Sequence, residues 1–277
     1  MTLSPNRSHF GGSCVTARMS TLASLRGSIE RIEADGEVLA LQKVALGHRA
    51  ADAMLRGGLA TAAMHEVFAQ GHQGAAASGF VAGIAGRIGL RKPLVWVRQD
   101  FAELESGALS PHGLAELGLD PRLLVTVRAA DVETALRTTA DALACDALGA
   151  VVLEVFGDPR QLDLVASRKI TLSAQASGVT ALLLRVGATP APSTAETRWI
   201  VRAAHSPPAL PWQVWGAPLF DANLVRNRHG PLGRWIMEWK CDACQFSEPS
   251  AYPQPLAATP AHRPHPAAVL HQQRRAG

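Results

Sequence analysis

The turn after the first strong strand pattern is the place where this chain could do phosphate chemistry. Residues 64–68 read as a strand, and an eight-residue segment from Ala69 to Ala76 follows them. A phosphate-binding loop at such a turn reads G-x-x-x-x-G-K-[ST]; its amides hold phosphate, its lysine neutralises it and its hydroxyl holds magnesium. The length and Gly74 fit, but Ala69, Ala75 and Ala76 replace the first glycine, the lysine and the hydroxyl residue. We therefore expect no nucleotide cofactor here.

No other cation is placed to replace the missing lysine. Lys92 precedes the next strand, at the opposite edge of the expected sheet, and Lys43 precedes the core. Arg87 ends the helix that follows the turn, ~15 Å along its axis at the usual rise per residue. The glycines and the helix N-terminus would leave at most weak anion binding. The pattern thus favours a protein that is not an enzyme.

Alternating strand and helix patterns surround this turn. Strands are expected at 64–68, 94–97, 123–127, 150–155, 179–184, 197–203 and 232–240. Helices are expected at 75–90, 113–117, 132–143 and 161–177, with Asp131 as the N-cap of the third. Such alternation predicts an α/β fold, in which helices flank a parallel or mixed sheet.

The order of these elements resembles that of RecA-family recombinases over roughly residues 55–240. GGLATAAMHEVFA (57–69) is similar to the stretch that leads into their phosphate loop, and LVWVRQD (94–100) to their second strand. Residues 114–143 follow the path of their third strand and next helix, and GAVVLEVFGDP (149–159) lies where they carry a magnesium-side aspartate. The resemblance implies a RecA-like fold.

The catalytic positions of that family depart from its pattern in this chain. The resemblance places Gln99 where a glutamate would activate water, and glutamine cannot act as a base. It places Glu154 at the magnesium-side aspartate and Gly187 near the glutamine that senses the third phosphate. For Glu154 we expect a structural role, as a carboxylate that bonds to a neighbouring loop. The chain reads as a degenerate relative without ATP hydrolysis.

One branch of the family, the ImuA (inducible mutagenesis A) proteins, is similar to the chain throughout, including NLVRNRHGPLGRWIMEWKCDA (223–243). These proteins are also related to cell-division inhibitors of the SulA type. The resemblance implies a non-catalytic adaptor in SOS mutagenesis and translesion DNA synthesis. Its partners would be a Y-family polymerase homologue of the ImuB type, RecA, and indirectly an error-prone replicative-type polymerase. The alternatives are a SulA-like division inhibitor and a divergent ATP-binding protein of the RecA family.

Three groups of residues are candidates for contacts with a partner or with DNA. They are an apolar helix face at Leu22, Leu25 and Ile29, a proline-rich loop with Trp212 and Trp215, and a basic cluster of Arg226, Arg228 and Arg234. The helix face could equally pack on its own domain. Aromatic residues and arginine are common in interface hot spots. The basic cluster could contact DNA or form a solvated charged edge.

Composition sets the remaining expectations. The formal net charge of +4 is carried almost entirely by arginine, which fits acidic partners or merely a compositional habit. The four cysteines do not form a disulfide framework in a chain this long, and Cys241 and Cys244 have the spacing of only half a zinc site. No apolar run is long enough for a membrane helix. We expect a cytoplasmic protein without a metal.

The chain divides into three parts. Residues 1–50 form an N-terminal arm with the amphipathic helix, and residues 51–244 form the degenerate RecA-like core. Residues 245–277 are rich in proline, arginine and histidine with little to bury, and we expect them to form a disordered tail.

Overall fold

The computed structural model describes residues 42–89, 91–208 and 216–249. The helices are α2 (Arg49–Met54), α3 (Gly74–Gly89), α4 (Asp100–Ser106), α5 (Pro111–Glu116), η1 (Pro121–Leu123), α6 (Val132–Leu143) and α7 (Leu164–Ser177). The strands are β1 (Lys43–Val44), β2 (Leu59–Ala60), β3 (Met64–Ala69), β4 (Leu94–Gln99), β5 (Leu124–Ala129), β6 (Ala150–Phe156), β7 (Thr180–Val186), β8 (Thr197–Ala203), β9 (Leu219–Asn227), β10 (Gly233–Lys240) and β11 (Gln245–Ser247).

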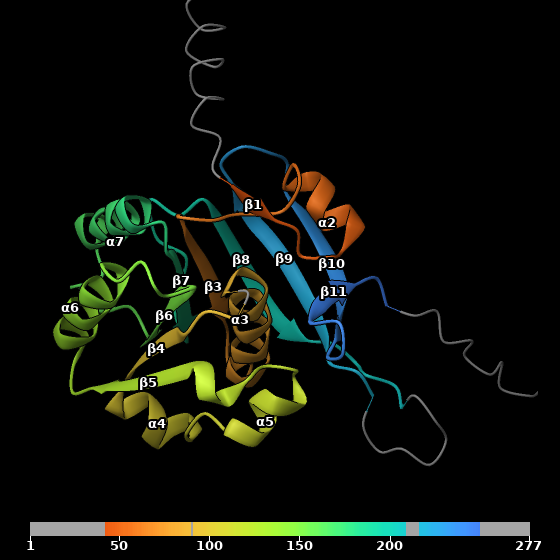
Figure 1. The fold of residues 1–277 in the computed structure, drawn as a ribbon, viewed down its shortest axis with the longest axis horizontal. Coiled ribbons are helices and arrows are strands. Elements are labelled where there is room, and N and C mark those ends of the chain that lie inside the picture. Colours follow the sequence, from red (N-terminus) through yellow and green to blue (C-terminus); the bar gives the residue numbers. More distant parts are fainter. Residues whose placement is uncertain (1–41, 90, 209–215, 250–277) are drawn as a thin grey trace, which may run out of the picture.

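Nine strands form one mixed sheet in the order β11-β10-β9-β8-β3-β7-β6-β4-β5 (Figure 1). The strands from β8 to β5 run parallel to one another, whereas β9, β10 and β11 are added antiparallel at one side. The predicted α/β class is confirmed, and the arrangement is compatible with a RecA-like fold.

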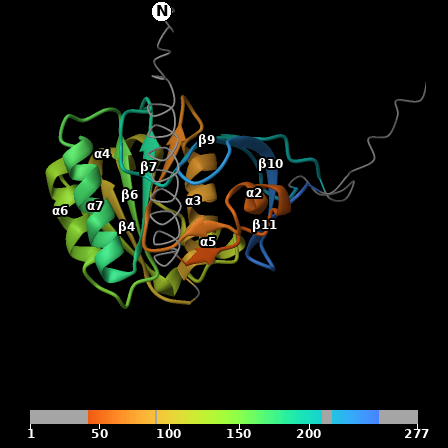
Figure 2. The same ribbon diagram turned by 90° about the horizontal axis from the view of Figure 1, so that it is seen from above.

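The central strands are buried because helices cover both faces of the sheet. Every residue of β3 is buried, as are six of the seven residues in each of β6 and β7. Near-continuous apolar runs of this kind are typical of parallel strands covered on both sides. Helix α3 packs on one face, and α6 and α7 pack on the other (Figure 2).

Small residues allow α3 to lie close to the sheet. A Cβ atom added at Gly83 would lie 3.0 Å from the rings of both Trp239 and Phe246. On the opposite face, α6 begins at Asp131, whose Oδ1 accepts a hydrogen bond from the Thr134 amide at 2.7 Å. The predicted N-cap at Asp131 is therefore confirmed.

Some elements differ from the sequence-based expectation. Helix α4 follows β4 without a turn, and β9 lies in a stretch for which no strand was expected. Strand β11 extends the sheet beyond residue 244, because Phe246 is fully buried against Trp239 and Phe80. Within the described ranges, no helix is both long and apolar enough to cross a membrane.

Several predictions fall outside the described residues. They concern the helix face at Leu22, Leu25 and Ile29, the loop tryptophans Trp212 and Trp215, and the tail from residue 250 onward.

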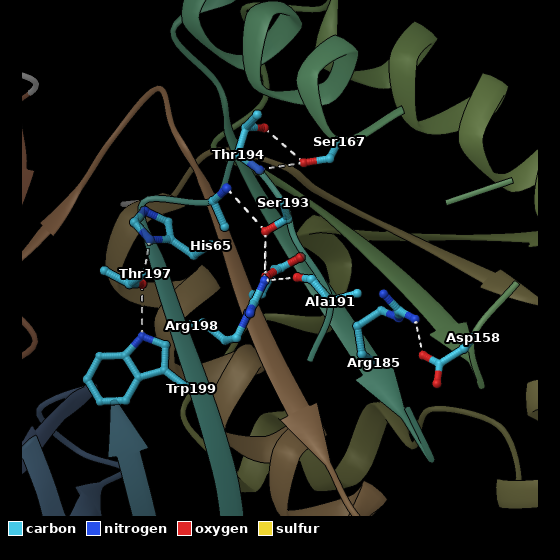
Figure 3. A network of polar contacts seen from close by, with 12 residues as sticks. His65, Asp158, Ser167, Arg185, Ala191, Ser193, Thr194, Thr197, Arg198 and Trp199 are labelled. Carbon is cyan, nitrogen blue, oxygen red and sulfur yellow. Dashed lines mark hydrogen bonds and ion pairs between the residues drawn. The ribbon is translucent and has the colours of Figure 1, made fainter. Parts of the chain in front are cut away.

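A buried histidine joins β3 to β8 and to the segment before β3 (Figure 3). The Nε2 atom of His65 lies 2.8 Å from the Ala60 carbonyl oxygen, which can only accept, so this nitrogen carries the proton. The Nδ1 atom accepts from the Thr197 hydroxyl at 2.8 Å, and the Thr197 oxygen accepts from the Trp199 indole at 3.0 Å. Burial lowers the pKa of His65, against the opposing effects of the Ala60 hydrogen bond and the charge of Glu196.

We expect the free energy of unfolding to fall as the pH drops below the ordinary histidine pKa of 6.5. Below that pH, His65 binds a proton in the unfolded chain but not in the folded chain. Its contribution to the free energy of unfolding is therefore complete above the ordinary pKa and is lost below it. Urea unfolding at about pH 7.5 and about pH 5.5 measures the loss. The wild type should lose more stability than His65→Gln between the two conditions; equal losses would contradict this account.

Candidate functional site

The turn after β3 lies at the position where sheets of this type bind ligands. Strand β3 lies next to β8, and the connection after β3 runs to β4 on one side whereas the connection after β8 runs to β9 on the other. Ligands of open α/β sheets bind at such a switch point, beyond the carboxyl ends of the strands. The turn at residues 69–76 therefore lies where a sheet of this type would bind a ligand.

Two glutamine side chains fasten this loop to the end of β8. The Ala203 amide donates to Oε1 of Gln73 at 2.7 Å, and Nη2 of Arg202 donates to Oε1 of Gln70 at 3.3 Å. Both glutamines occupy variable positions of the motif, so the sequence pattern gave no signal for these contacts. The loop is therefore bonded to the end of β8 by its own side chains.

A cavity of about 350 Å³ adjoins the loop. It lies between the first turns of α3, the strands β4 and β6, and the α4–α5 segment. Its walls include Gly74, Ala75, Ser78, Arg98, Glu154 and residues 106–110. Among the described residues that line it, Arg98 is the one cation.

The Arg98 guanidinium is fully engaged with Glu154. Its Nε lies 2.8 Å from Oε2 of Glu154 and its Nη2 lies 3.0 Å from Oε1, while Nη1 donates to the Gly107 carbonyl at 3.0 Å. The Trp96 indole donates to Oε2 of Glu154 at 2.8 Å. Both charged side chains are only 4% exposed. The expected loop partner of Glu154 is therefore corrected: the carboxylate bonds to the neighbouring strand β4.

Register explains why this pair forms. Arg98 and Glu154 are directly paired residues of the parallel strands β4 and β6, so their side chains emerge on the same face. A bidentate arginine–carboxylate pair is among the strongest charge-assisted contacts. A magnesium ion at Glu154 would have to compete with this guanidinium, because both cations would bind the same carboxylate.

The other positions identified by resemblance also make structural bonds. Oε1 of Gln99 accepts from the Phe156 amide at 3.1 Å, and Asp100 next to it pairs with Arg128 at 3.0 Å. The Gly187 amide donates to the Ala69 carbonyl at 2.9 Å. Gln99, Asp100 and Gly187 thus lie with Glu154 around the carboxyl edge of the sheet.

A second polar cluster at this edge was not predicted from the sequence (Figure 3). On the face covered by α6 and α7, Arg198 pairs with Glu66 at 2.7 Å. The guanidinium carbons of Arg198 and Arg185 lie 5.5 and 5.6 Å from the centre of the Phe68 ring. Arg185 pairs with Asp158 at 2.8 Å. Burial lowers the pKa of Arg185, while the charges of Asp158 and Glu66 raise it.

This cluster joins the loops that follow β6 and β7. Nη2 of Arg185 donates to the Gly157 carbonyl at 2.9 Å, and the Thr189 hydroxyl donates to Asp158 at 2.8 Å. The hydrogen bond from that hydroxyl is the main reason why the pKa of Asp158 is lowered. The two loops are thus bound to each other across the edge of the sheet.

The predicted basic cluster is spread over β9, the turn after it and β10. Arg228 lies 3.3 Å from Glu196, and Arg234 pairs with Asp221 and lowers the pKa of that carboxyl. Arg226 lies opposite Arg198 in the β8–β9 pairing. Two of the three predicted contact residues are therefore in ion pairs with acidic neighbours.

The cysteine pair lies in the turn between β10 and β11. The Cys244 thiol donates to the Gly118 carbonyl at 3.2 Å, and burial raises the pKa of Cys241. Three thiols in the described residues, those of Cys145, Cys241 and Cys244, are free. No group of three or more histidine, cysteine, aspartate or glutamate residues is arranged to hold a metal in the part of the chain that the structure describes.

No protein-family model matches the chain, and no curated protein matches it. The fold and the contacts above are therefore the observations on which a function can be proposed.

The Arg98–Glu154 pair should be a major contributor to stability. We expect Arg98→Met to lower the free energy of unfolding by about 3–5 kcal/mol, because it leaves a buried carboxylate without its cation. Arg98→Met combined with Glu154→Gln should recover more than half of that loss, since the amide oxygen can still accept from Trp96. Urea unfolding of each variant measures these differences.

Arg128→Met is the matched control, because it removes an arginine from an exposed pair at the same edge. It should have a much smaller effect on stability. If Arg98→Met and Arg128→Met cost the same, the buried pair does not anchor this edge.

Proposed function

We propose that this chain is a non-catalytic RecA-like adaptor in SOS-induced translesion DNA synthesis and mutagenesis. It binds a Y-family polymerase homologue of the ImuB type, RecA, or both, and through them an error-prone replicative-type polymerase. The observation that supports the non-catalytic part is the bonding of Glu154: Arg98 and Trp96 make three hydrogen bonds to the carboxylate that resemblance assigns to magnesium. The alanines at 69, 75 and 76 remove the phosphate ligands beside it.

The sheet order supports the RecA-like part of this proposal. A chain with the shape of a RecA protomer, but without cycling between nucleotide states, can cap or join a filament while its own conformation stays fixed. The side-chain bonds around the carboxyl edge favour such a fixed conformation, because Gln70, Gln73 and the Arg185–Asp158 pair fasten the loops that would otherwise respond to nucleotide. DNA contact through Arg226 remains part of the proposal. We place the protein in the cytoplasm, in keeping with the free thiols.

Affinity capture of the tagged full-length chain from DNA-damaged cells tests the proposal. We expect RecA or a Y-family polymerase homologue to be recovered, and to bind again when both proteins are purified. Recovery of a cell-division protein, with filamentous cells on overexpression, would instead support the SulA-like alternative. Recovery of none of these would remove the functional assignment and leave the fold.

Truncation then locates the binding surface. Removal of residues 1–41 or of residues 250–277 leaves every described strand in place, including β11, which Phe246 anchors in the core. Partner binding that survives both truncations lies on the core. Binding lost with the first truncation only would assign it to the arm that contains Leu22, Leu25 and Ile29.

A further inference from the structure

A second cavity, of about 400 Å³, lies away from the degenerate phosphate loop. It is bounded by the second half of α3, the first residues of β4 and β5, the α5–η1 segment and the β10–β11 turn. Its apolar walls are Ala82, Ala85, Gly86, Gly89, Leu94, Trp96, Leu114, Leu119, Leu123 and Leu124. Cavities of this size and apolar character are typical of small-molecule sites.

The sequence of α3 creates this space. Ala85, Gly86 and Gly89 present no side chain large enough to fill it. Opposite them, Leu119 packs beside Gly86, where an added Cβ atom would lie 2.3 Å from its Cδ2 atom, and both Leu119 and Leu123 are half-buried. The cavity therefore lies between small residues on one face of α3 and a wall that includes leucines of the α5–η1 segment.

Two cations stand at the rim, in the turn between α3 and β4. Arg91 is exposed and makes no hydrogen bond or ion pair with the described residues, and Lys92 has only a 3.4 Å contact with the Asp146 carbonyl. The opposing charge at the rim is Asp120, but Arg122 binds it at 2.8 Å and lowers its pKa to about 2. Asp120 is thus ionised, and the charge of Arg122 offsets its negative charge. Arg91 and Lys92 therefore leave the rim with a net positive charge.

The backbone of Arg91 adds an independent observation. Its φ of 74° lies in the left-handed region, where glycine is the residue without strain. A residue with a long charged side chain therefore has a strained backbone beside an apolar cavity, and local strain of this kind often accompanies a functional role.

We propose that this cavity binds a small amphiphilic monoanion, with an aliphatic or aromatic body among the leucines and Trp96 and a carboxylate at Arg91 and Lys92. The body that fits is on the order of ten carbons. This cavity shares Ala82, Trp96 and Leu114 with the cavity beside Glu154, but Arg91 and Lys92 line only this one. The proposed anion binding does not rest on the adaptor function, and either can fail without the other.

Calorimetric titration of the full-length protein with decanoate and with decanol tests the proposal. Both have the same apolar chain, so their difference reports the charged rim. Decanoate should bind about threefold to fivefold more tightly, as expected for an exposed charge contact. Equal affinities, or no binding of either compound, would overturn the proposal.

Arg91→Gly removes the charge and the backbone strain together. We expect it to abolish most of the preference for decanoate while the melting temperature stays the same or rises. Arg56→Gly is the matched control, because Arg56 is also exposed and has a φ of 54°, but it does not line the cavity. An equal loss of preference in both variants would show that overall charge, and not this rim, selects the anion.

Leu123→Trp should fill the cavity and abolish the binding of both compounds. Its melting temperature is measured alongside, and Leu119→Phe replaces it if the larger side chain destabilises the fold. Unchanged decanoate binding in a folded cavity-filling variant would place the ligand elsewhere and contradict the proposal.

Discussion

The ion pair between Arg98 and Glu154 is the constraint on which the carboxyl edge of this sheet depends. Direct pairing of β4 with β6 places both charges on one face, and burial leaves them no water to bond. Two buried charges are tolerable only when each is neutralised and hydrogen-bonded, and the Trp96 indole and the Gly107 carbonyl complete that requirement. The pair thereby connects two central strands to the segment between α4 and α5.

Other polar side chains along this edge also bond to neighbouring protein groups. Gln73 holds the turn after β3, and Arg185 with Asp158 joins the loops after β6 and β7. Arg98 with Glu154 and Arg185 with Asp158 form ion pairs at this edge, whereas Arg91 at the second cavity makes no hydrogen bond or ion pair with the described residues.

Much of the fold could be predicted because burial leaves a clear mark on sequence. The apolar runs of β3, β6 and β7 and the cap at Asp131 follow from local rules. Strand β11 could not be predicted, because three residues are too few to show an alternating pattern of apolar and polar residues. In addition, Phe246 packs against Phe80, which is far away in the sequence. The site could be predicted only in part. The absence of a lysine at position 75, which is Ala75, can be seen in the sequence. The partner of Glu154 could not be predicted, because it depends on strand register. The second cavity depends on how Leu119 and Leu123 of the α5–η1 segment are placed relative to α3, which no sequence pattern records.

We propose that the carboxyl edge, where these polar side chains bond to one another, binds no nucleotide. Isothermal titration of the wild-type protein with magnesium-ATP is the direct test. We expect no saturable heat up to about 1 mM nucleotide, where binding would correspond to only about 4 kcal/mol. Saturable binding in the micromolar range, abolished by a substitution in the turn at Gly74, would contradict it and would make this chain a nucleotide-binding protein with an unusual phosphate grip.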